Sequence, residues 1–179
     1  MNPADPLFDL TGKVAAITGG GGVICGAFAR ELGARGVKVA VLDRAVANAQ
    51  NVVDQINAAG GTALAVACDV LDLASIRAAA DTIIGAFGRI DILINGAGGN
   101  KKEATTGPEM SFFDIPADAL RFVIDLNLLG SVLPSQVFGK IMAEQKDGVI
   151  LTISSMNSFR PLTKIIGYST AKAAINNFT

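Results

Sequence analysis

One tyrosine and one lysine could carry proton chemistry in a chain that contains no histidine. Tyr168 and Lys172 stand four positions apart in the sequence YSTAK, so on a helix they would lie one turn apart on the same face. A lysine ammonium beside a phenol favours the phenolate and lowers a pKa that is ordinarily about 10. The phenol could then act as general acid and base near neutral pH. An isolated pair with this spacing is otherwise typical of an ordinary, partly exposed helix face.

A glycine run could hold a phosphate. Four consecutive glycines follow the apolar stretch KVAAIT: Gly19, Gly20, Gly21 and Gly22. Glycines let the backbone approach a diphosphate closely, and a helix that begins near Val23 and Ile24 would direct its amides at the anion. The pattern G-x-G-x-x-G is not met, because its last glycine would fall on Cys25. We expect phosphate binding here, and a flexible turn is the plain alternative.

An acidic residue ends the second apolar stretch, VKVAVLD. Asp43 lies 24 residues beyond Gly19, which places it to accept hydrogen bonds from the adenosine ribose of a dinucleotide. Its charge would repel a 2′-phosphate, so it favours NAD over NADP. Arg44 could instead pair with such a phosphate. Taken alone, Asp43 could equally be an exposed carboxylate at the end of a strand.

Strands and helices alternate in the segments that must position these residues. Strands are expected at 13–18, 37–43, 62–69, within 91–98 and at 148–154, and helices at 23–36, 46–60, 72–88, 117–145 and from 168 onward. Strands that are apolar on both faces and separated by helices predict a parallel sheet in a three-layer, doubly wound α/β fold. Ligands bind such a sheet beyond the carboxyl ends of its strands, where the residues above are expected.

The composition narrows the function classes. A formal charge of -1 from 15 basic and 16 acidic residues gives no basis for nucleic-acid binding. No apolar run approaches the ~20 residues of a membrane span, and the first residues lack the order of a secretory signal. Without histidine, Cys25 and Cys68 cannot complete a metal site, so we expect two buried thiols and no metal. The sequence predicts one cytoplasmic domain over 1–179 that does not bind membranes.

Six motifs in their order and spacing resemble the short-chain dehydrogenase/reductase family, from about Leu7 to the last residue. They are TGGGG, CDV (68–70), NGAG (95–98), DLNLLG (125–130), ISS (153–155) and YSTAK. The resemblance implies a Rossmann-like fold, NAD(P)-dependent oxidoreductase activity and a homodimer or homotetramer. It also implies the catalytic roles. Ser155 would hydrogen-bond the substrate oxygen, Tyr168 would move its proton, Lys172 would assist Tyr168 and hold the nicotinamide ribose, and Asn127 would hold a water in the proton relay.

The resemblance further assigns the cofactor contacts. The diphosphate would lie on Gly19 and its neighbours up to Ile24, the adenosine ribose on Asp43 beside Arg44, the adenine on Asp69 and Val70, and the nicotinamide-side ribose on Asn95, Gly96 and Ala97, with Tyr168 and Lys172 beyond. The family pattern T-G-x-x-x-G-x-G has Val23 and Cys25 where its later glycines would stand. Diphosphate binding is still expected, but with a different loop geometry.

The substrate and the extent of the chain follow from the same resemblance. The glycine run, NGAGGNKKEATT and the segments around Phe112 and Phe159 look like the mannonate (fructuronate) oxidoreductase-like branch, which implies a sugar acid or a polyol as substrate. Four basic residues could meet a substrate carboxylate or be solvated loop charges: Lys101, Lys102, Arg160 and Lys164. The chain ends soon after Tyr168, so we expect a fragment of a longer enzyme. A dinucleotide-binding fragment without turnover, or an assembly protein, are the alternatives.

Overall fold

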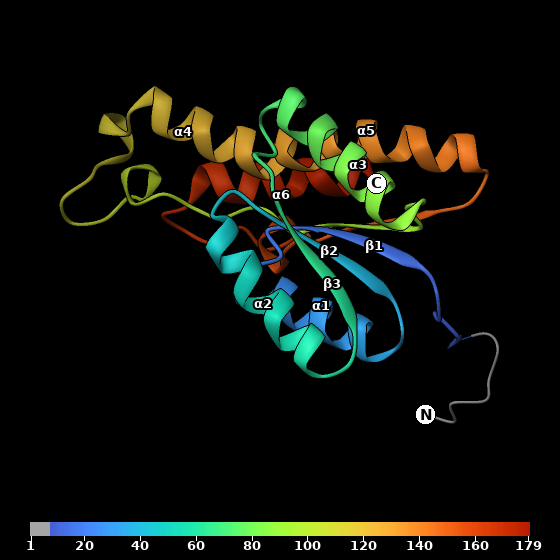
Figure 1. The fold of residues 1–179 in the computed structure, drawn as a ribbon. Coiled ribbons are helices and arrows are strands. Elements are labelled where there is room, and N and C mark those ends of the chain that lie inside the picture. Colours follow the sequence, from blue (N-terminus) through green and yellow to red (C-terminus); the bar gives the residue numbers. More distant parts are fainter. Residues whose placement is uncertain (1–7) are drawn as a thin grey trace.

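A five-stranded parallel sheet forms the centre of the computed structural model, which describes residues 8–179 (Figure 1). The strands are β1 (Val14–Thr18), β2 (Lys38–Asp43), β3 (Thr62–Ala67), β4 (Ile92–Asn95) and β5 (Val149–Thr152). Their spatial order is β3-β2-β1-β4-β5, and every neighbouring pair is parallel. The order reverses between β1 and β4, and ligands bind parallel sheets at such a point. The predicted fold class is confirmed.

Helices cover both faces of the sheet (Figure 1). They are α1 (Val23–Ala34), α2 (Val46–Ala58), α3 (Leu73–Phe87), α4 (Ala117–Ile124), α5 (Gly130–Gln145) and α6 (Ile166–Phe178). One hydrophobic core packs α1 and α2 against the sheet and includes Ala29 and Ile56. A second core on the opposite face includes Ile83 of α3 and Phe138 of α5. Residues 1–7 lie outside the part of the chain that the structure describes. They include Leu7, where the family resemblance begins, and the stretch over which no secretory signal is expected.

The helix α3 shows how local sequence sets an element's limits. The Asp72 side chain caps its first turn by accepting a hydrogen bond from the Ala74 amide at 2.8 Å. At the other end, Gly88 adopts the left-handed conformation with φ 80°, which glycine tolerates and which stops the helix. The buried residues recur every three or four positions, as on one helix face: Ile76, Ala79, Ala80 and Ile83.

The long helix predicted at 117–145 is interrupted, which corrects the expectation of one regular helix. A π-helical turn, Asp125–Leu129, joins α4 to α5. Pro134 lies inside α5 and has no amide hydrogen to donate to the carbonyl four residues earlier. Short π-helical turns often accompany functional sites, and the turn Asp125–Leu129 contains Asn127.

By length and composition alone, the helical stretch Ala117–Gln145 could cross a membrane, with a mean hydropathy of 1.3 over its most apolar window. A helical stretch of this length and hydropathy was not expected from the sequence. Of that window, 33% is buried inside the protein, and α5 packs against α3 and β4. Contact with the sheet is a sufficient reason for the apolar character of the buried part.

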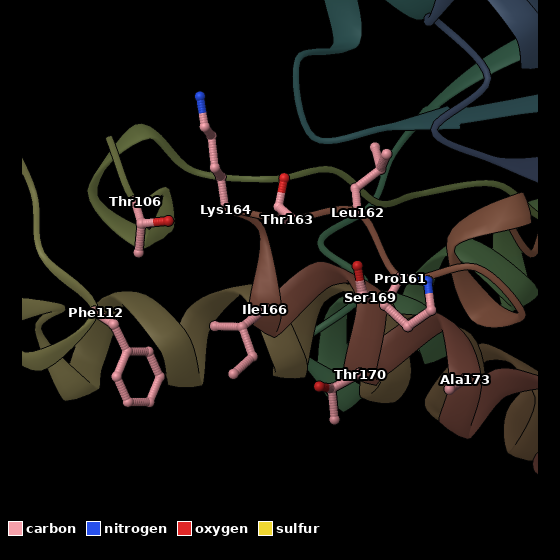
Figure 2. Close-up of a pocket in the computed structure, with 10 residues that line it drawn as sticks. All are labelled: Thr106, Phe112, Pro161, Leu162, Thr163, Lys164, Ile166, Ser169, Thr170 and Ala173. Atoms are coloured by element: carbon pink, nitrogen blue, oxygen red, sulfur yellow. The ribbon is translucent and has the colours of Figure 1, made fainter. Parts of the chain in front are cut away.

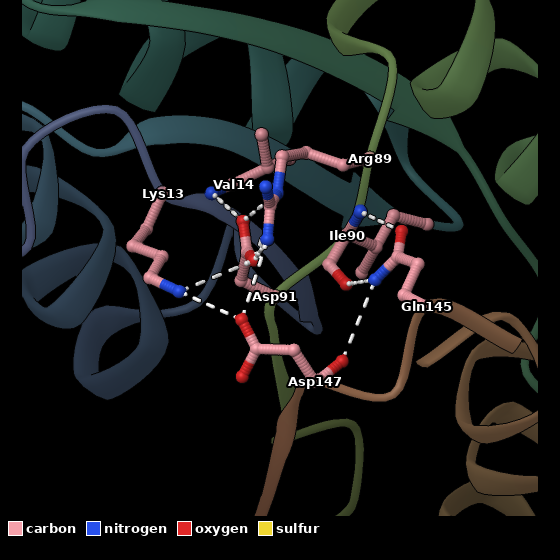
Figure 3. A network of polar contacts seen from close by, with 7 residues as sticks. All are labelled: Lys13, Val14, Arg89, Ile90, Asp91, Gln145 and Asp147. Atoms are coloured by element: carbon pink, nitrogen blue, oxygen red, sulfur yellow. Dashed lines mark hydrogen bonds and ion pairs between the residues drawn. The ribbon is translucent and has the colours of Figure 1, made fainter. Parts of the chain in front are cut away.

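An ion-pair network joins β1, β4 and β5 at their amino ends (Figure 3). The buried Asp91 carboxylate accepts the Val14 amide at 2.9 Å and is paired with Arg89. Lys13 reaches the Asp147 carboxylate at 2.9 Å and that of Asp91 at 3.6 Å. Beside it, the Gln145 amide nitrogen donates to the Ile90 carbonyl at 2.7 Å. These contacts align the strands at the end opposite to their carboxyl termini.

Replacing Asp91 by Asn should weaken this end of the sheet. Burial alone would raise the pKa of Asp91 above its ordinary 3.8, but the hydrogen bonds from Arg89 and Val14 and the positive charge of Arg89 and Lys13 hold it lower. The ionised carboxylate therefore stabilises the fold above its ordinary pKa, and that contribution is lost as the pH falls through the lowered value.

We expect Asp91→Asn to lower the free energy of unfolding by about 1–3 kcal/mol at neutral pH, and the difference from wild type to shrink in acid. Urea unfolding at neutral and acidic pH measures both effects. The matched control is Asp118→Asn, which changes an exposed pair with Arg121. An Asp91→Asn variant as stable as the control would contradict this account of the network.

Candidate active site

The glycine run turns tightly at the carboxyl end of β1. Gly19 has φ 63°, in the left-handed region that favours glycine. A Cβ atom on Gly19 would lie 2.9 Å from the Ala97 Cα, and one on Gly20 would lie 2.7 Å from Val41 Cγ1. Side chains are thus excluded where the loop touches β2 and the segment after β4. The Gly20, Gly21 and Gly22 amides donate within the protein, to Leu42, Asp43 and Gly19.

The helix α1 begins directly after this loop. Gly22 is its N-cap residue and has no side chain with which to cap it, so the first amides of the helix lack carbonyl partners within the helix. The Val23 and Ile24 side chains are 89% and 65% exposed, whereas Cys25 is buried. An anion placed at this turn would meet amide hydrogens and the positive end of the helix dipole.

Asp43 lies against the glycine loop. One of its carboxylate oxygens accepts a hydrogen bond from the Gly21 amide at 3.2 Å. The other accepts one from the Ala45 amide at 2.9 Å. The structure therefore joins the two segments that the sequence analysis linked only by their separation along the chain.

A groove of about 330 Å³ opens at the carboxyl ends of the strands. Six of the predicted cofactor-binding residues line it together: Gly19, Asp43, Arg44, Asp69, Val70 and Ala97. Five further lining residues were not predicted: Cys68, Leu71, Gly98, Phe122 and Leu126. The last two are four positions apart on the helix after Pro116. Their apolar spacing is visible in the sequence, but which helix face meets the groove depends on tertiary packing.

The residues after β4 divide between the groove and the core. The Gly96 and Ala97 amides both donate to the Thr18 hydroxyl, at 3.1 and 3.3 Å. Asn95 turns away from the groove, because its side-chain amide donates to the Ser135 hydroxyl of α5 at 2.9 Å and it is 1% exposed. The structure thus separates the Asn95 side chain from the predicted ribose contacts.

Asn127 ties the segment after β4 to the π turn. Its side-chain amide donates to the carbonyls of Gly99 at 2.6 Å and Val123 at 2.8 Å, and its side-chain oxygen accepts the Gly99 amide at 3.1 Å. The residue is fully buried. The sequence analysis singled out Asn127 but had no signal for these contacts, because the π turn that positions it has no pattern of its own.

Lys172 reaches the same segment from α6. A Cβ atom on Gly98 would lie 2.7 Å from Asn127 Oδ1 and 3.5 Å from Lys172 Nζ, so Gly98 lies beside both side chains. Lys172 Nζ donates to the Ile153 carbonyl at 2.7 Å and lies 5.8 Å from the centre of the Tyr168 ring. Burial lowers the pKa of Lys172, and the nearby Cys25 opposes that shift.

Ser155 and Tyr168 approach this region from the segment after β5 and from α6. The Ser155 hydroxyl oxygen accepts the Asn157 amide at 3.1 Å, which leaves its own O–H able to donate. The preceding Ser154 donates instead to the Asn176 side chain at 2.6 Å, so it is engaged within the fold. The Tyr168 ring packs against a small core that includes Ala119 and Val123. The four predicted catalytic residues are thus carried by segments that pack on one another.

A larger cavity, of about 650 Å³, lies on another face of α6 (Figure 2). It is lined from α6 by Ile166, Ser169, Thr170 and Ala173, and from the neighbouring loops by Thr106, Phe112, Pro161, Leu162, Thr163 and Lys164. These α6 positions share a helix face that excludes Tyr168 and Lys172. This cavity is therefore separate from the predicted catalytic residues.

The predicted basic residues do not gather at one place. Lys101 lies 5.4 Å from the centre of the Phe122 ring, beside the groove. Lys164 lines the larger cavity, has φ 80° and holds the Thr106 amide through its carbonyl at 2.9 Å. Lys102 and Arg160 are exposed. Both predicted thiols are free and buried, as expected.

The sequence of this chain is similar to a known protein family and to known oxidoreductases. A family model described as short chain dehydrogenase matches residues 13–179. An uncharacterized oxidoreductase, UxuB, of Bacillus subtilis (strain 168) is 49% identical over 183 residues, which cover 97% of this chain and 66% of that protein.

Two solved structures share the fold. One, with bound NAD, is provisionally described as a D-mannonate oxidoreductase from Haemophilus influenza, with 45% identity, a TM-score of 0.92, and coverage of 96% of this chain and 65% of that one. The other is an NAD+-bound xylitol dehydrogenase, with 28% identity, a TM-score of 0.86, and coverage of 94% and 63%. This chain therefore spans slightly less than two thirds of the relatives' own length.

Replacing Asn127 by Ala should release the segment after β4. The change leaves the Gly99 amide and carbonyl without their side-chain partner. We expect the free energy of unfolding to fall by about 1–3 kcal/mol and hydrogen exchange at the Gly99 amide to accelerate. Urea unfolding and exchange measured by NMR test this. Asn100→Ala, which removes an exposed bond to Thr105, is the control. Unchanged exchange at Gly99 would contradict the proposed tie.

Proposed function

The chain belongs to the short-chain dehydrogenase family, and from that premise we propose that it binds NAD and transfers a hydride between the nicotinamide and a hydroxyl or ketone substrate. The observation that carries the proposal is the position of Gly98, which lines the groove that contains Asp43 and lies beside both Asn127 and Lys172. A flat, polar ligand could run from the glycine loop to Tyr168 along this path. NAD has the chemistry that each end of the path would recognise.

The residues present fit a dinucleotide. Gly19 and Gly98 lack side chains where a Cβ atom would crowd the neighbouring backbone or the predicted catalytic side chains. Asp43 offers carboxylate oxygens for ribose hydroxyls at the groove, and its negative charge disfavours a 2′-phosphate. Arg44 lines the same groove and would favour such a phosphate. NAD is the proposed cofactor because backbone hydrogen bonds hold the Asp43 carboxylate in place, one from Gly21 of the loop and one from Ala45.

The protein's part in the reaction is orientation and proton movement, while the nicotinamide supplies or accepts the hydride. Ser155 would donate its hydroxyl hydrogen to the substrate oxygen, on which negative charge develops. Tyr168 would give a proton to that oxygen in reduction, or remove the hydroxyl proton in oxidation. Lys172, anchored at the Ile153 carbonyl, has two further ammonium hydrogens for a ribose hydroxyl. Asn127 would keep Gly98 and Gly99 in place beside it.

We propose a sugar acid or a polyol as the substrate. The names of two relatives, a D-mannonate oxidoreductase and a xylitol dehydrogenase, support this class. Lys101, beside the groove, is the basic side chain best placed to meet a carboxylate. Residues 1–179 as one cytoplasmic domain stay a prediction. So does the homodimer or homotetramer, which is supported by the partly exposed Leu129 on the long helical stretch.

A dinucleotide-binding module without turnover is the second candidate. The observation that favours it is β5, whose Val149, Ile150 and Leu151 side chains are 55%, 38% and 48% exposed. A sheet edge that is apolar and open could leave the nicotinamide end of the site incompletely supported. Binding of NAD without hydride transfer would identify this second function.

Replacing Tyr168 by Phe should separate chemistry from binding. The ring would keep its packing against Ala119 and Val123, but the phenol proton would be lost. We expect NADH formation with mannonate, gluconate or simple polyols to fall by at least about a hundredfold, with the NAD dissociation constant within about twofold of wild type. Absorbance of NADH and calorimetry measure the two quantities. Turnover equal to wild type would refute the role of Tyr168.

Replacing Asp43 by Asn should change the choice of cofactor. The amide keeps an oxygen that can accept a backbone hydrogen bond, but it lacks the charge that repels a 2′-phosphate. We expect the ratio of the NADP to the NAD dissociation constant to fall by at least about tenfold, as measured by calorimetry. Asp54→Asn, on the exposed side of α2, is the control. A ratio unchanged from wild type would mean that Asp43 does not face the ribose.

A further inference from the structure

Cys25 stands where the family's glycine-loop pattern has a glycine, and its side chain fills a specific space. The residue is the third of α1 and is 4% exposed. Its Sγ atom occupies the position that a Cβ atom on Gly96 would require, and the Cys25 Cβ lies 3.5 Å from that position. The sulfur atom of one segment therefore packs into the gap left by the glycine of the other.

Gly96 is needed for space and not for its backbone conformation. Positive φ angles occur at Gly19 and Gly99 on either side of the groove, but Gly96 lies outside that region of backbone conformation. Any residue could adopt its backbone angles. What a side chain would meet there is Cys25 Sγ, and the Thr18 carbonyl oxygen at 2.9 Å.

This contact lies at the junction of the glycine loop with β4. The Thr18 hydroxyl accepts both the Gly96 and the Ala97 amide, and Gly19 touches Ala97. The segment then continues to Gly98, which lies beside Asn127 and Lys172. A displacement at Gly96 would therefore change the distance between the diphosphate loop and the predicted catalytic side chains.

The Cys25 thiol is suited to act as an apolar filler. Burial raises the pKa of this thiol, and the positive charge of Lys172 opposes that change. The net direction is upward, so the group stays uncharged at neutral pH. The role of the Cys25 side chain at this junction is therefore to fill space.

We propose that Cys25 and Gly96 form a complementary steric pair that sets the spacing between the glycine loop and the carboxyl end of β4. Cys25 is thus a positioning residue for the nicotinamide end of the cofactor, acting through Gly96. The Cys25 side chain fills the space that Gly96 leaves open, so the two positions are complementary in volume. Its effect on NAD rests on the proposed function, whereas the steric coupling does not.

A double-mutant cycle with Gly96→Ala, Cys25→Ala and the double variant tests the pair. Gly96→Ala alone should weaken NAD binding by at least about tenfold. In the Cys25→Ala background, where the sulfur is gone, the same change should cost at least about fivefold less. The Thr18 carbonyl remains close, so rescue is expected to be partial. Equal costs in both backgrounds would overturn the proposal.

A second ligand distinguishes positioning from a general loss of structure. ADP reaches the glycine loop but not the nicotinamide end, so Gly96→Ala should leave its dissociation constant within about twofold of wild type. Equal weakening of ADP and NAD would overturn the positioning role. Gly33→Ala is the matched control. Gly33 lies on α1, like Cys25, and its Cβ atom would lie 2.6 Å from Ile56 Cγ2 of α2, away from the groove. Its cost should not depend on Cys25.

The unfolding temperature gives a readout that needs no cofactor. Gly96→Ala should lower this temperature less in the Cys25→Ala background than in wild type, because the clash with the sulfur is absent. If wild type binds neither NAD nor ADP, the proposed function fails. The coupling between the two substitutions in unfolding temperature still tests whether Cys25 and Gly96 form a steric pair. Additive changes in the unfolding temperature would overturn the pair whatever the binding data show.

Discussion

The reciprocal hydrogen bonds between the Asn127 side chain and the Gly99 backbone are the contact on which the candidate site depends. They join the segment that leaves β4 to the π turn between α4 and α5. Because Asn127 is fully buried, its side chain could not exchange these bonds for water without opening the fold. The position of Gly98, next to Lys172 and at the groove, follows from this tie.

The amino and carboxyl ends of the sheet differ in the contacts that they make. At the amino ends, Asp91 and its basic partners join the first residues of neighbouring strands by charge and hydrogen bonds. At the carboxyl ends, glycines leave space, and Asp43 and Arg44 bring charge to it. The ion pairs lie at the end where no ligand is expected, and the open end keeps glycines at positions where a side chain would crowd its neighbours. This division leaves the groove at the carboxyl ends open for the proposed cofactor.

The sequence predicted most of the fold because the strands are short apolar runs ending in recognisable residues. Asp43 and the glycine run were found by their order after two strands, and the structure brings them within hydrogen-bonding distance. The π turn escaped prediction, since it depends on how a helix packs and not on a local pattern. For the same reason the inward turn of Asn95 and the groove contact of Phe122 could not be anticipated. Side-chain direction at the end of a strand is a tertiary property.

The most direct test of the account is the place where NAD binds. Titration of NAD into the isotope-labelled chain, followed by the backbone amide signals in NMR, would locate it. The account predicts shifts at Gly22, Gly98 and Gly99, with no change at Gly88 and Gly148 at the opposite end of the sheet. Shifts confined to the cavity around Ser169 and Thr170, or no shifts at all, would contradict the claim that the carboxyl ends of β1 and β4 form the cofactor site.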